Sequence, residues 1–291
     1  ECEAGSVLRA VRRRGTAGAR TPAPVASPFL TLRDGMQRLV DCLAGTLQRT
    51  VWRLGVRAVA LEPGQPGGFR ITLSDGTRLE ADGVVIAAPA ASAAILLQSL
   101  LAAESEWLRA LPYASSAAVT LVYRDADLEP VARGRGFLVP ARERRPISAV
   151  TWVTNKFPAR APEGFAVARV FFRSNGNGLH DEEPPERLVA LALHELRMLT
   201  GLRAQPLHAV VSRHDRALPQ YPVGHRERVI RLRAALARWP GLAVAGATFD
   251  GVGVPDCIAS GWRAAVAVMD GLGITDGLHP DPAAQSFQER R

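Results

Sequence analysis

The chain has 291 residues with a formal net charge of +8, 47% hydrophobic and 22% charged residues, a balance typical of a globular protein with a sizeable core. Lys156 is the only lysine. The sequence has no basic stripe interleaved with aromatic residues, which is the pattern that would indicate a nucleic-acid partner. The three cysteines and six histidines lack metal-ligand spacing. With no signal-peptide pattern at the start, the sequence predicts a reduced, metal-free, cytoplasmic protein.

The first third of the chain predicts a helix followed by short strands. Residues 1–28 are rich in Arg, Ala and Pro and predict a mobile or partly helical segment. Residues 34–49 have apolar residues at helical spacing, which predicts one buried face. That face consists of Met36, Leu39, Val40, Leu43 and Leu47. Strands are predicted at 56–61, 69–73 and 78–80, joined by turns rich in Gly, Pro and Asp.

An uncharged stretch at 84–103 is long enough to resemble a membrane span. Pro89 interrupts it, and proline suits the first turn of a helix. The better prediction is therefore a buried strand at 83–88 followed by a helix that starts at Pro89.

The middle of the chain, between 111 and 222, predicts a mostly antiparallel sheet. Its expected strands are residues 118–123, 136–139, 148–154, 166–172 and 210–213. A helix is predicted over 184–199, with Leu188, Leu196 and either Leu191 or Ala192 facing inward. We interpret this part as a second domain inserted into the first.

The strongest local motif lies near the end, where the sequence GATFDGVGVPDCIASG occupies residues 246–261. A helix at 225–238 precedes it, and the pattern predicts a strand at 242–248, a glycine-rich turn and a helix at 256–272. Such a turn directs backbone N–H groups and the positive end of a helix dipole at one spot. Gly251 and Gly253 would let a flat or anionic ligand approach, although the turn itself could also require them.

Three sequence blocks resemble the FAD-dependent protoporphyrinogen and coproporphyrinogen oxidases. TLRDGMQRL at 31–39 and ADGVVIAAPA at 81–90 also fit the wider group of amine-oxidase-like flavoproteins. LPQYPVGH at 218–225, followed by the glycine motif, narrows the resemblance to the porphyrinogen oxidases. The resemblance spans roughly residues 4–272.

The resemblance implies an α/β FAD-binding domain with an inserted α+β, mostly antiparallel-sheet substrate domain. The expected FAD-domain segments are 29–98 and 241–273, the substrate domain is 99–240, and 274–291 form a loose tail. The family opens with a strand–GxGxxG–helix unit that binds the FAD pyrophosphate, and this sequence has no GxGxxG. We therefore expect an incomplete FAD domain that lacks the N-terminal βαβ unit, in a chain that is a truncated product or a fragment.

Site residues follow from the same resemblance. Val56 matches the position whose backbone faces the adenine end of FAD, and Val252, Gly253 and Val254 match the turn beside the flavin. A plain core valine is the alternative for Val56.

For the substrate, Arg135, Gly136 and Leu138 match the strand that lines the tetrapyrrole cavity, where Arg135 could reach a propionate. A solvent-facing arginine on an edge strand is the alternative for Arg135. No paired carboxylates or His–carboxylate constellation identify a catalytic base, which stays unknown.

The implied activity is oxidation of a porphyrinogen to the porphyrin in haem biosynthesis, with FAD as cofactor and molecular oxygen as acceptor. The GC-rich composition resembles that of high-GC Gram-positive bacteria and favours coproporphyrinogen III. Arg142, Arg144, Arg145 and Arg160 fit its additional carboxylates or are solvated loop charges. Another amine-oxidase-like flavoenzyme and an inactive remnant stay open as alternatives. So do a homodimer and a peripheral contact with a membrane.

Overall fold

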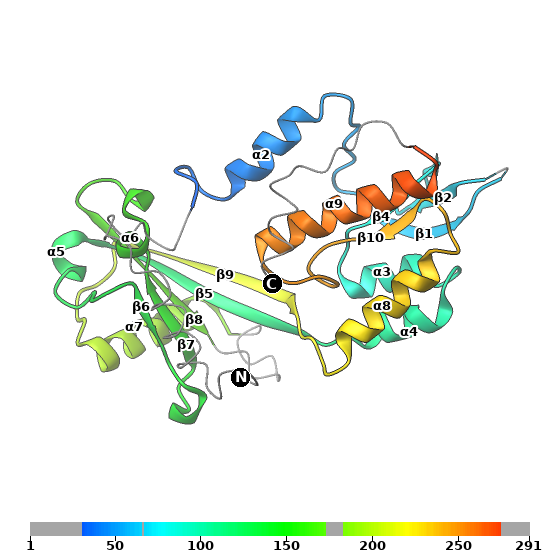
Figure 1. Ribbon diagram of the computed structural model, residues 1–291. Helices are drawn as coiled ribbons and strands as arrows, with labels where there is room; N and C mark the ends of the chain where they lie inside the picture. The colour runs from blue at the N-terminus through cyan, green and yellow to red at the C-terminus, as the bar shows by residue number, and fades with distance from the viewer. Residues whose placement is uncertain (1–30, 66, 173–182, 275–291) are drawn as a thin grey trace, which may run out of the picture.

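The computed structural model describes residues 31–65, 67–172 and 183–274, which form two lobes (Figure 1). Two long paired strands, β5 (Tyr113–Arg124) and β9 (His208–Pro219), belong to the sheet of one lobe and extend toward the other. The sequence predictions for residues 1–28, for a turn at 174–178 and for the tail after Ile274 lie outside the described residues.

The first lobe, here called the sheet lobe, contains a five-stranded antiparallel sheet in the order β6-β7-β8-β5-β9. Its remaining strands are β6 (Gly136–Leu138), β7 (Ile147–Trp152) and β8 (Phe165–Phe172). Helix α7 (Pro185–Thr200) packs on this sheet through Leu188, Ala192 and Leu196, as predicted. The connections contain the short helices α5 (Asp125–Leu128), α6 (Val153–Lys156), η1 (Ala141–Glu143) and η2 (Pro158–Arg160).

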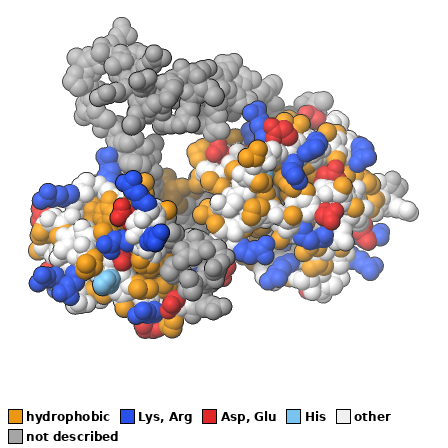
Figure 2. All heavy atoms as spheres, turned by 90° about the horizontal axis from the view of Figure 1, so that it is seen from below, with side chains coloured by type: hydrophobic (Ala, Val, Ile, Leu, Met, Phe, Trp, Pro, Cys, Tyr) orange, Lys and Arg blue, Asp and Glu red, His pale blue; other side chains and the backbone are white. Residues whose placement is uncertain are grey.

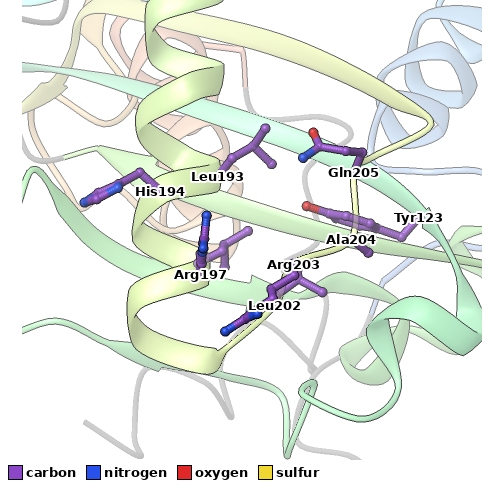
Figure 3. A pocket seen from close by; sticks show the side chains of 9 residues that line it. Tyr123, Leu193, His194, Arg197, Leu202, Arg203, Ala204 and Gln205 are labelled. Carbon is purple, nitrogen blue, oxygen red and sulfur yellow. The ribbon is translucent and has the colours of Figure 1, made fainter.

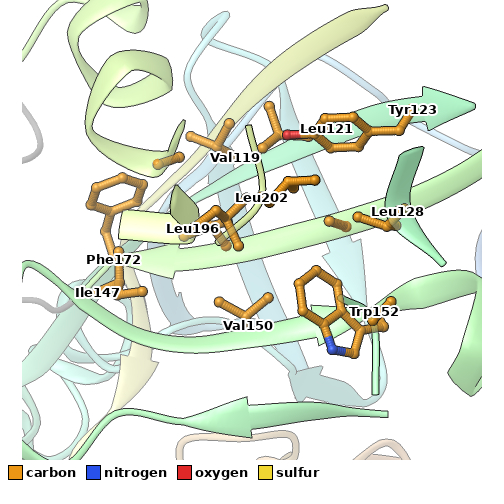
Figure 4. Close-up of a cluster of buried hydrophobic side chains, with 14 of the residues drawn as sticks. Val119, Leu121, Tyr123, Leu128, Ile147, Val150, Trp152, Phe172, Leu196 and Leu202 are labelled. Atoms are coloured by element: carbon orange, nitrogen blue, oxygen red, sulfur yellow. The ribbon is translucent and has the colours of Figure 1, made fainter. Parts of the chain in front are cut away.

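The core of the sheet lobe follows the two-residue period of its strands. In β5, Val119, Leu121 and Tyr123 are completely buried, and they meet Trp152 of β7 and Leu196 of α7 in one cluster (Figure 4). Burial of such large side chains typically contributes about 1.5–3 kcal/mol each. This cluster gives the middle of the chain a hydrophobic core of its own.

The second lobe, here called the parallel-strand lobe, is built around two parallel strands. They are β4 (Val84–Ile86) and β10 (Leu242–Val244), which pair in register. An antiparallel meander packs beside them, made of β1 (Ala58–Pro63), β2 (Phe69–Leu73) and β3 (Arg78–Ala81). The helices are α3 (Ala90–Leu97), α4 (Ala102–Ala110), α8 (His225–Leu236) and α9 (Val254–Gly271).

Each lobe has its own large hydrophobic cluster. The cluster of the parallel-strand lobe includes Leu97 of α3, Leu108 of α4 and Leu232 of α8, so α4 and α8 pack with the β4 and β10 strands. The predicted substrate-domain bounds of 99 and 240 include both helices. Those bounds stay a prediction, and the packing favours counting α4 and α8 with the parallel-strand lobe.

The predicted amphipathic helix exists as α2 (Gln37–Thr46), but its predicted buried face is wrong. Met36, Val40, Leu43 and Leu47 are exposed, Leu39 is only half-buried, and α2 contains no buried residue. In Figure 1, α2 lies outside the two lobes. A periodic pattern fixes which residues share a face, but burial also requires a partner for that face.

Three strands differ most from their predicted bounds. β10 ends at Val244 rather than at residue 248, because Gly246 takes a φ of +102° that turns the chain out of the sheet. β5 starts at Tyr113 and β9 ends at Pro219, both well beyond the predicted apolar runs. The added residues include Ser115, Ser116 and His214, whose side chains gave no apolar alternation.

The stretch at 84–103 folds as strand β4 followed by helix α3, as the sequence predicted. Among the described residues, no helix is long and apolar enough to cross a membrane.

Candidate functional site

The candidate site lies where β4 and β10 end side by side. The strands are parallel, so the segments that follow them, 87–89 and 245–253, leave the sheet at the same edge. The carboxyl edge of a parallel sheet is where ligands usually bind in α/β folds. Ala245 donates its backbone N–H to the Ile86 carbonyl at 3.0 Å, which keeps the two segments together beyond the strands.

A hydroxyl pair anchors this edge to the long strand β5. The hydroxyls of Tyr113 and Thr248 are 2.8 Å apart, and Thr248 is buried. The backbone N–H of Ala90, in the first turn of α3, donates to the Tyr113 hydroxyl at 2.9 Å. One of the N–H groups that a helix start leaves unpaired is thereby satisfied. Tyr113 thus ties the start of β5 to both segments of the site.

Asp250 fixes the second segment to two helices. Its carboxylate lies 2.6 Å from Arg233 of α8 and 2.9 Å from Arg263 of α9, and the Ser260 hydroxyl also donates to it. Burial opposes ionisation of Asp250, but hydrogen bonds from Arg233 and Ser260 and the nearby arginine charges outweigh it. The pKa of Asp250 is therefore lowered from its usual value.

An aromatic stack lies beside the same segment. The ring of His225 stacks on Tyr221 with centroids 4.4 Å apart and lies 5.7 Å from the Trp107 ring. The Tyr221 hydroxyl donates to the carbonyl of Ala247. His225 is buried, and burial lowers its pKa from the usual value, so the neutral imidazole is favoured. The LPQYPVGH block thus supports the turn after β10 rather than forming an independent motif.

The turn from Gly251 to Val254 is the exposed tip of the site. The side chain of Val252 is 53% exposed and that of Val254 is 49% exposed. Gly251 has a φ of +135°, and a Cβ atom on Gly251 or Gly253 would lie 2.8 Å from the Asp256 carboxylate. The backbone conformation therefore requires glycine at Gly251, whereas a shift of the Asp256 carboxylate would admit a Cβ atom at Gly253. Their proposed role toward a ligand stays a prediction.

This turn suits a neutral, flat group better than a phosphate. It presents backbone and valine side chains, and the carboxylate of Asp256 lies in the first turn of α9. A negative side chain at a helix start offsets the dipole that would attract an anion. The contact of Val252, Gly253 and Val254 with the flavin stays a prediction. A Gly-rich pyrophosphate unit is not found among the described residues.

The remaining predicted residues lie elsewhere. Val56 is half-buried and precedes β1 in the parallel-strand lobe, directly after Gly55, whose φ is +78°. Arg135, Gly136 and Leu138 lie at β6, the edge strand of the sheet lobe. The structure therefore places the predicted cofactor residues and the predicted substrate residues in different lobes.

The β6 residues have structural roles that the sequence did not reveal. Gly136 has a φ of +136°, and a Cβ atom there would lie 2.1 Å from the Val150 carbonyl, so this position needs glycine for strand pairing. Leu138 is 82% exposed, and Arg135 is exposed. A half-buried Phe137 between them packs edge-on against Trp152. β6 thus offers an apolar side chain and a cation on an open edge.

Of the four arginines weighed for substrate carboxylates, three contact their own chain. Arg145 pairs with the buried Glu195 at 3.0 Å, Arg142 lies 3.6 Å from Glu143, and Arg160 donates to the Thr31 hydroxyl. Across the face in Figure 2, Lys and Arg side chains are spread over both lobes with acidic residues among them. No group of three or more His, Cys, Asp or Glu side chains suited to a metal occurs in the part of the chain that the structure describes.

Sequence reasoning missed the residues that build the site's support. Thr248 and Asp250 stood inside the glycine motif, where polar residues after a buried strand are a usable signal. Tyr113 lies 135 residues from Thr248 in sequence, so no local pattern could have joined them. Tyr221 and His225 were noticed only through the resemblance.

Comparison with known proteins matches residues 3–269 to the family described as flavin-containing amine oxidoreductases. The chain is 35% identical to a coproporphyrinogen III oxidase of Propionibacterium freudenreichii over 253 residues, 87% of this chain and 47% of that protein. It is 31% identical to the Bacillus subtilis coproporphyrinogen III oxidase over 261 residues, 89% of this chain and 54% of that protein.

Among solved structures, one from Exiguobacterium sp. 255-15, assigned by name to the protoporphyrinogen oxidases, superposes with a TM-score of 0.77 at 31% identity. The match covers 94% of this chain and 57% of that one. The chain therefore spans about half the length of the relatives it matches. The predicted resemblance to porphyrinogen oxidases is confirmed.

Proposed function

Because this chain belongs to the flavin-containing amine oxidoreductase family, whose flavin cofactor is FAD, we propose that it supplies the substrate-side part of a porphyrinogen oxidase of haem biosynthesis. The preferred substrate in this proposal is coproporphyrinogen III, and molecular oxygen is the final acceptor. The observation that carries the proposal is the exposed Gly251–Val254 turn, fixed at the shared edge of β4 and β10.

The chemistry that FAD would supply when bound is the acceptance of hydride from the porphyrinogen. The protein would contribute contact, orientation and exclusion of water. Val252 and Val254 would contact the flavin ring, and the backbone of Val56 would contact the adenine end. The turn is held in place by Tyr113, Thr248 and Asp250. These residues are not exposed at its tip, so they would support the turn without contacting the flavin. A turn fixed by that many partners can position a ring without reorganising.

On the substrate side, Leu138 and the backbone of Gly136 would face the apolar macrocycle, and Arg135 would pair with a propionate. The open edge of β6 and the exposed leucine support this assignment. An arginine–carboxylate pair gives both charge and directional hydrogen bonds. The relatives bearing the name coproporphyrinogen III oxidase support this substrate.

We further propose that the described residues form an incomplete FAD domain. A two-stranded parallel sheet is at the lower limit of what folds stably, since parallel strands are normally covered on both faces. The exposed apolar stripe of α2 and a second one on α9 (Val254, Ile258 and Trp262) support this view. Residues 31–274 alone would then bind FAD weakly, and this expectation favours the inactive-remnant alternative for this chain by itself.

The test of the proposed activity uses the full-length product of the gene that encodes this chain, supplied with FAD. Porphyrin fluorescence is followed with coproporphyrinogen III and with protoporphyrinogen IX at matched concentrations in air. We expect faster formation of coproporphyrin. Equal or reversed rates would remove the substrate assignment, and oxidation of amines but not porphyrinogens would favour another member of the family.

The test of the site uses Val252→Glu, with Ile230→Glu on α8 as the control, since both valine and isoleucine are exposed in the same lobe. A carboxylate against the flavin should lower the FAD content of the purified protein at least about tenfold, equivalent to about 1.4 kcal/mol. The control should keep its flavin. Equal FAD content in the two variants would mean that the turn does not face the cofactor.

A further inference from the structure

The sheet lobe contains a cavity whose lining residues take no part in the proposed flavin site. Its volume is about 230 Å³, and it opens between α7, the end of β5 and the segment 202–205 (Figure 3). The described lining residues are Tyr123, Leu193, His194, Leu196, Arg197, Leu202, Arg203, Ala204 and Gln205. Since one water occupies roughly 30 Å³ of liquid volume, the space can hold several waters or one small organic molecule.

The hydroxyl of Tyr123 is the unusual feature of this cavity. Tyr123 is completely buried, and its hydroxyl has no hydrogen-bond partner among the residues that the structure describes. Figure 3 shows the phenol oxygen directed between α7 and the 202–205 segment. Buried polar groups in proteins are nearly always hydrogen-bonded, so an unpaired hydroxyl at a cavity indicates a missing partner. Burial raises the pKa of Tyr123 to about 12, so the group remains an O–H donor at neutral pH.

The other lining residues define what that partner is. Leu196 and Leu202 are buried and form an apolar floor, while Arg197 and Arg203 are exposed at the rim. Neither guanidinium has a carboxylate within 4.0 Å among the described residues, and the described lining contains no Asp or Glu. The cavity thus combines an apolar surface, a buried donor and two cations. A phosphate ion would leave the leucines without a contact.

We propose that this cavity is a binding site for a small organic carboxylate. The Tyr123 hydroxyl is closed off from the cavity in this structure, so binding includes a small movement of the lining side chains that lets the hydroxyl donate to the carboxylate. The carboxylate then lies in the field of Arg197 and Arg203, and the apolar body contacts Leu196 and Leu202. Hydrogen bonds to a charged acceptor and a nearby guanidinium are stronger than neutral ones. The site lies in the sheet lobe and does not depend on the flavin chemistry proposed above.

Equilibrium dialysis of the full chain with radiolabelled benzoate tests the proposal, because it measures bound ligand whether or not the protein self-associates. We expect saturable binding of about one benzoate per chain. Tyr123→Phe removes only the hydroxyl and should weaken binding about tenfold, as should Arg197→Gln. Arg187→Gln, which makes the same charge change in the first turn of α7 outside the cavity, should bind like the original chain.

Neutral benzamide and inorganic phosphate, each added as a competitor at constant ionic strength, distinguish the alternatives. Benzamide competing as well as benzoate would overturn the role of charge, and phosphate competing as well would overturn the role of the apolar floor. Equal losses in Arg187→Gln and Arg197→Gln would mean that only bulk charge matters. Absence of saturable binding would overturn the site itself. Far-UV circular dichroism confirms that Tyr123→Phe folds, and Arg197→Gln on the exposed rim provides an independent variant.

Discussion

The two lobes of this chain treat their apolar residues differently. In the sheet lobe, strands β5, β7 and β8 and helix α7 bury one large cluster in which Trp152 and Leu196 are almost inaccessible. In the parallel-strand lobe, α3 is deeply buried, but α9 leaves Ile258 and Trp262 exposed. The first lobe completes its core with its own residues, whereas the second also forms an apolar surface that the described residues leave uncovered.

The difference follows from the kind of sheet in each lobe. Antiparallel strands need no crossover connection and can bury one face against a single helix, as the sheet does against α7. Parallel strands need crossover connections and cover on both faces, and β4 and β10 are separated by more than 150 residues. A chain that contributes two such strands therefore keeps surfaces that only further contacts can cover.

The largest expected effect compares two tryptophans. Trp152→Ala should lower the free energy of unfolding by about 3–5 kcal/mol, because it leaves a cavity in a closed core. Trp262→Ala on the exposed face of α9 should change it by no more than about 0.5 kcal/mol. Urea unfolding followed by circular dichroism measures both. Similar losses for the two variants would show that the α9 face is covered in solution.

A smaller effect is expected at Asp250, which joins α8 and α9 to the site. Asp250→Asn leaves Arg233 and Arg263 without their carboxylate and should cost about 2 kcal/mol, since each hydrogen bond to a charged group is worth about 1.5–3 kcal/mol. The control is Asp270→Asn at an exposed position near the end of α9, which should leave the free energy of unfolding unchanged. If the lobes unfold separately in urea, only the transition of the parallel-strand lobe should move. A shift in the sheet-lobe transition instead would contradict the division into two cores.

The next effect is a dependence on pH that belongs to the parallel-strand lobe alone. Burial lowers the pKa of His225 in the folded chain below its usual value of 6.5. Between these two pKa values the unfolded chain therefore binds more protons than the folded chain. The free energy of unfolding should therefore fall as the pH is lowered through 6.5 toward the lower pKa of the folded state. His225→Phe should reduce this fall, and His208→Asn, at an exposed position of β9, should not. An identical pH profile in the His225 variant would exclude this histidine as the source.

The smallest effect on stability, and the clearest on association, is expected on the open face of α9. Ile258→Lys, on an exposed position of the apolar stripe, should change the free energy of unfolding by no more than about 0.5 kcal/mol. The same change should raise the monomer fraction in analytical ultracentrifugation, because exposed apolar patches promote association. Ile230→Lys, equally exposed on α8, is the matched control. Equal association in both variants would mean that the α9 stripe is not the contact surface.

Much of the fold could be read from local patterns. The three-four spacing in α7 placed Leu188 and Leu196 in the core correctly, and of the two alternatives Leu191 and Ala192 the structure buries Ala192. Pro89 marked the start of α3, and the strand–turn–helix around Gly251 was predicted with only a shift in bounds. These features depend on neighbouring residues and on backbone sterics, which a sequence specifies directly.

The site was only partly predictable for the same reason. The Val252–Val254 turn was found because its glycines and the family resemblance lie in one short segment. Its supports, Tyr113 and His225, come from other elements and meet it only in three dimensions. The sequence also could not show why position 136 needs glycine, because the atom that a Cβ would meet there is the Val150 carbonyl oxygen of a neighbouring strand.

The sequence by itself determined the elements, the family and the side chains that share a face, because periodicity, turn residues and motifs are local properties. Only the tertiary structure decided which faces are buried. The amphipathic pattern of α2 is complete, yet Val40 and Leu43 stay exposed, while the hydroxyl of Tyr123 is sealed beside a cavity. Burial depends on contacts between elements distant in sequence. The free energy gained by burying apolar surface and the conformational entropy lost therefore arise only when the chain has folded.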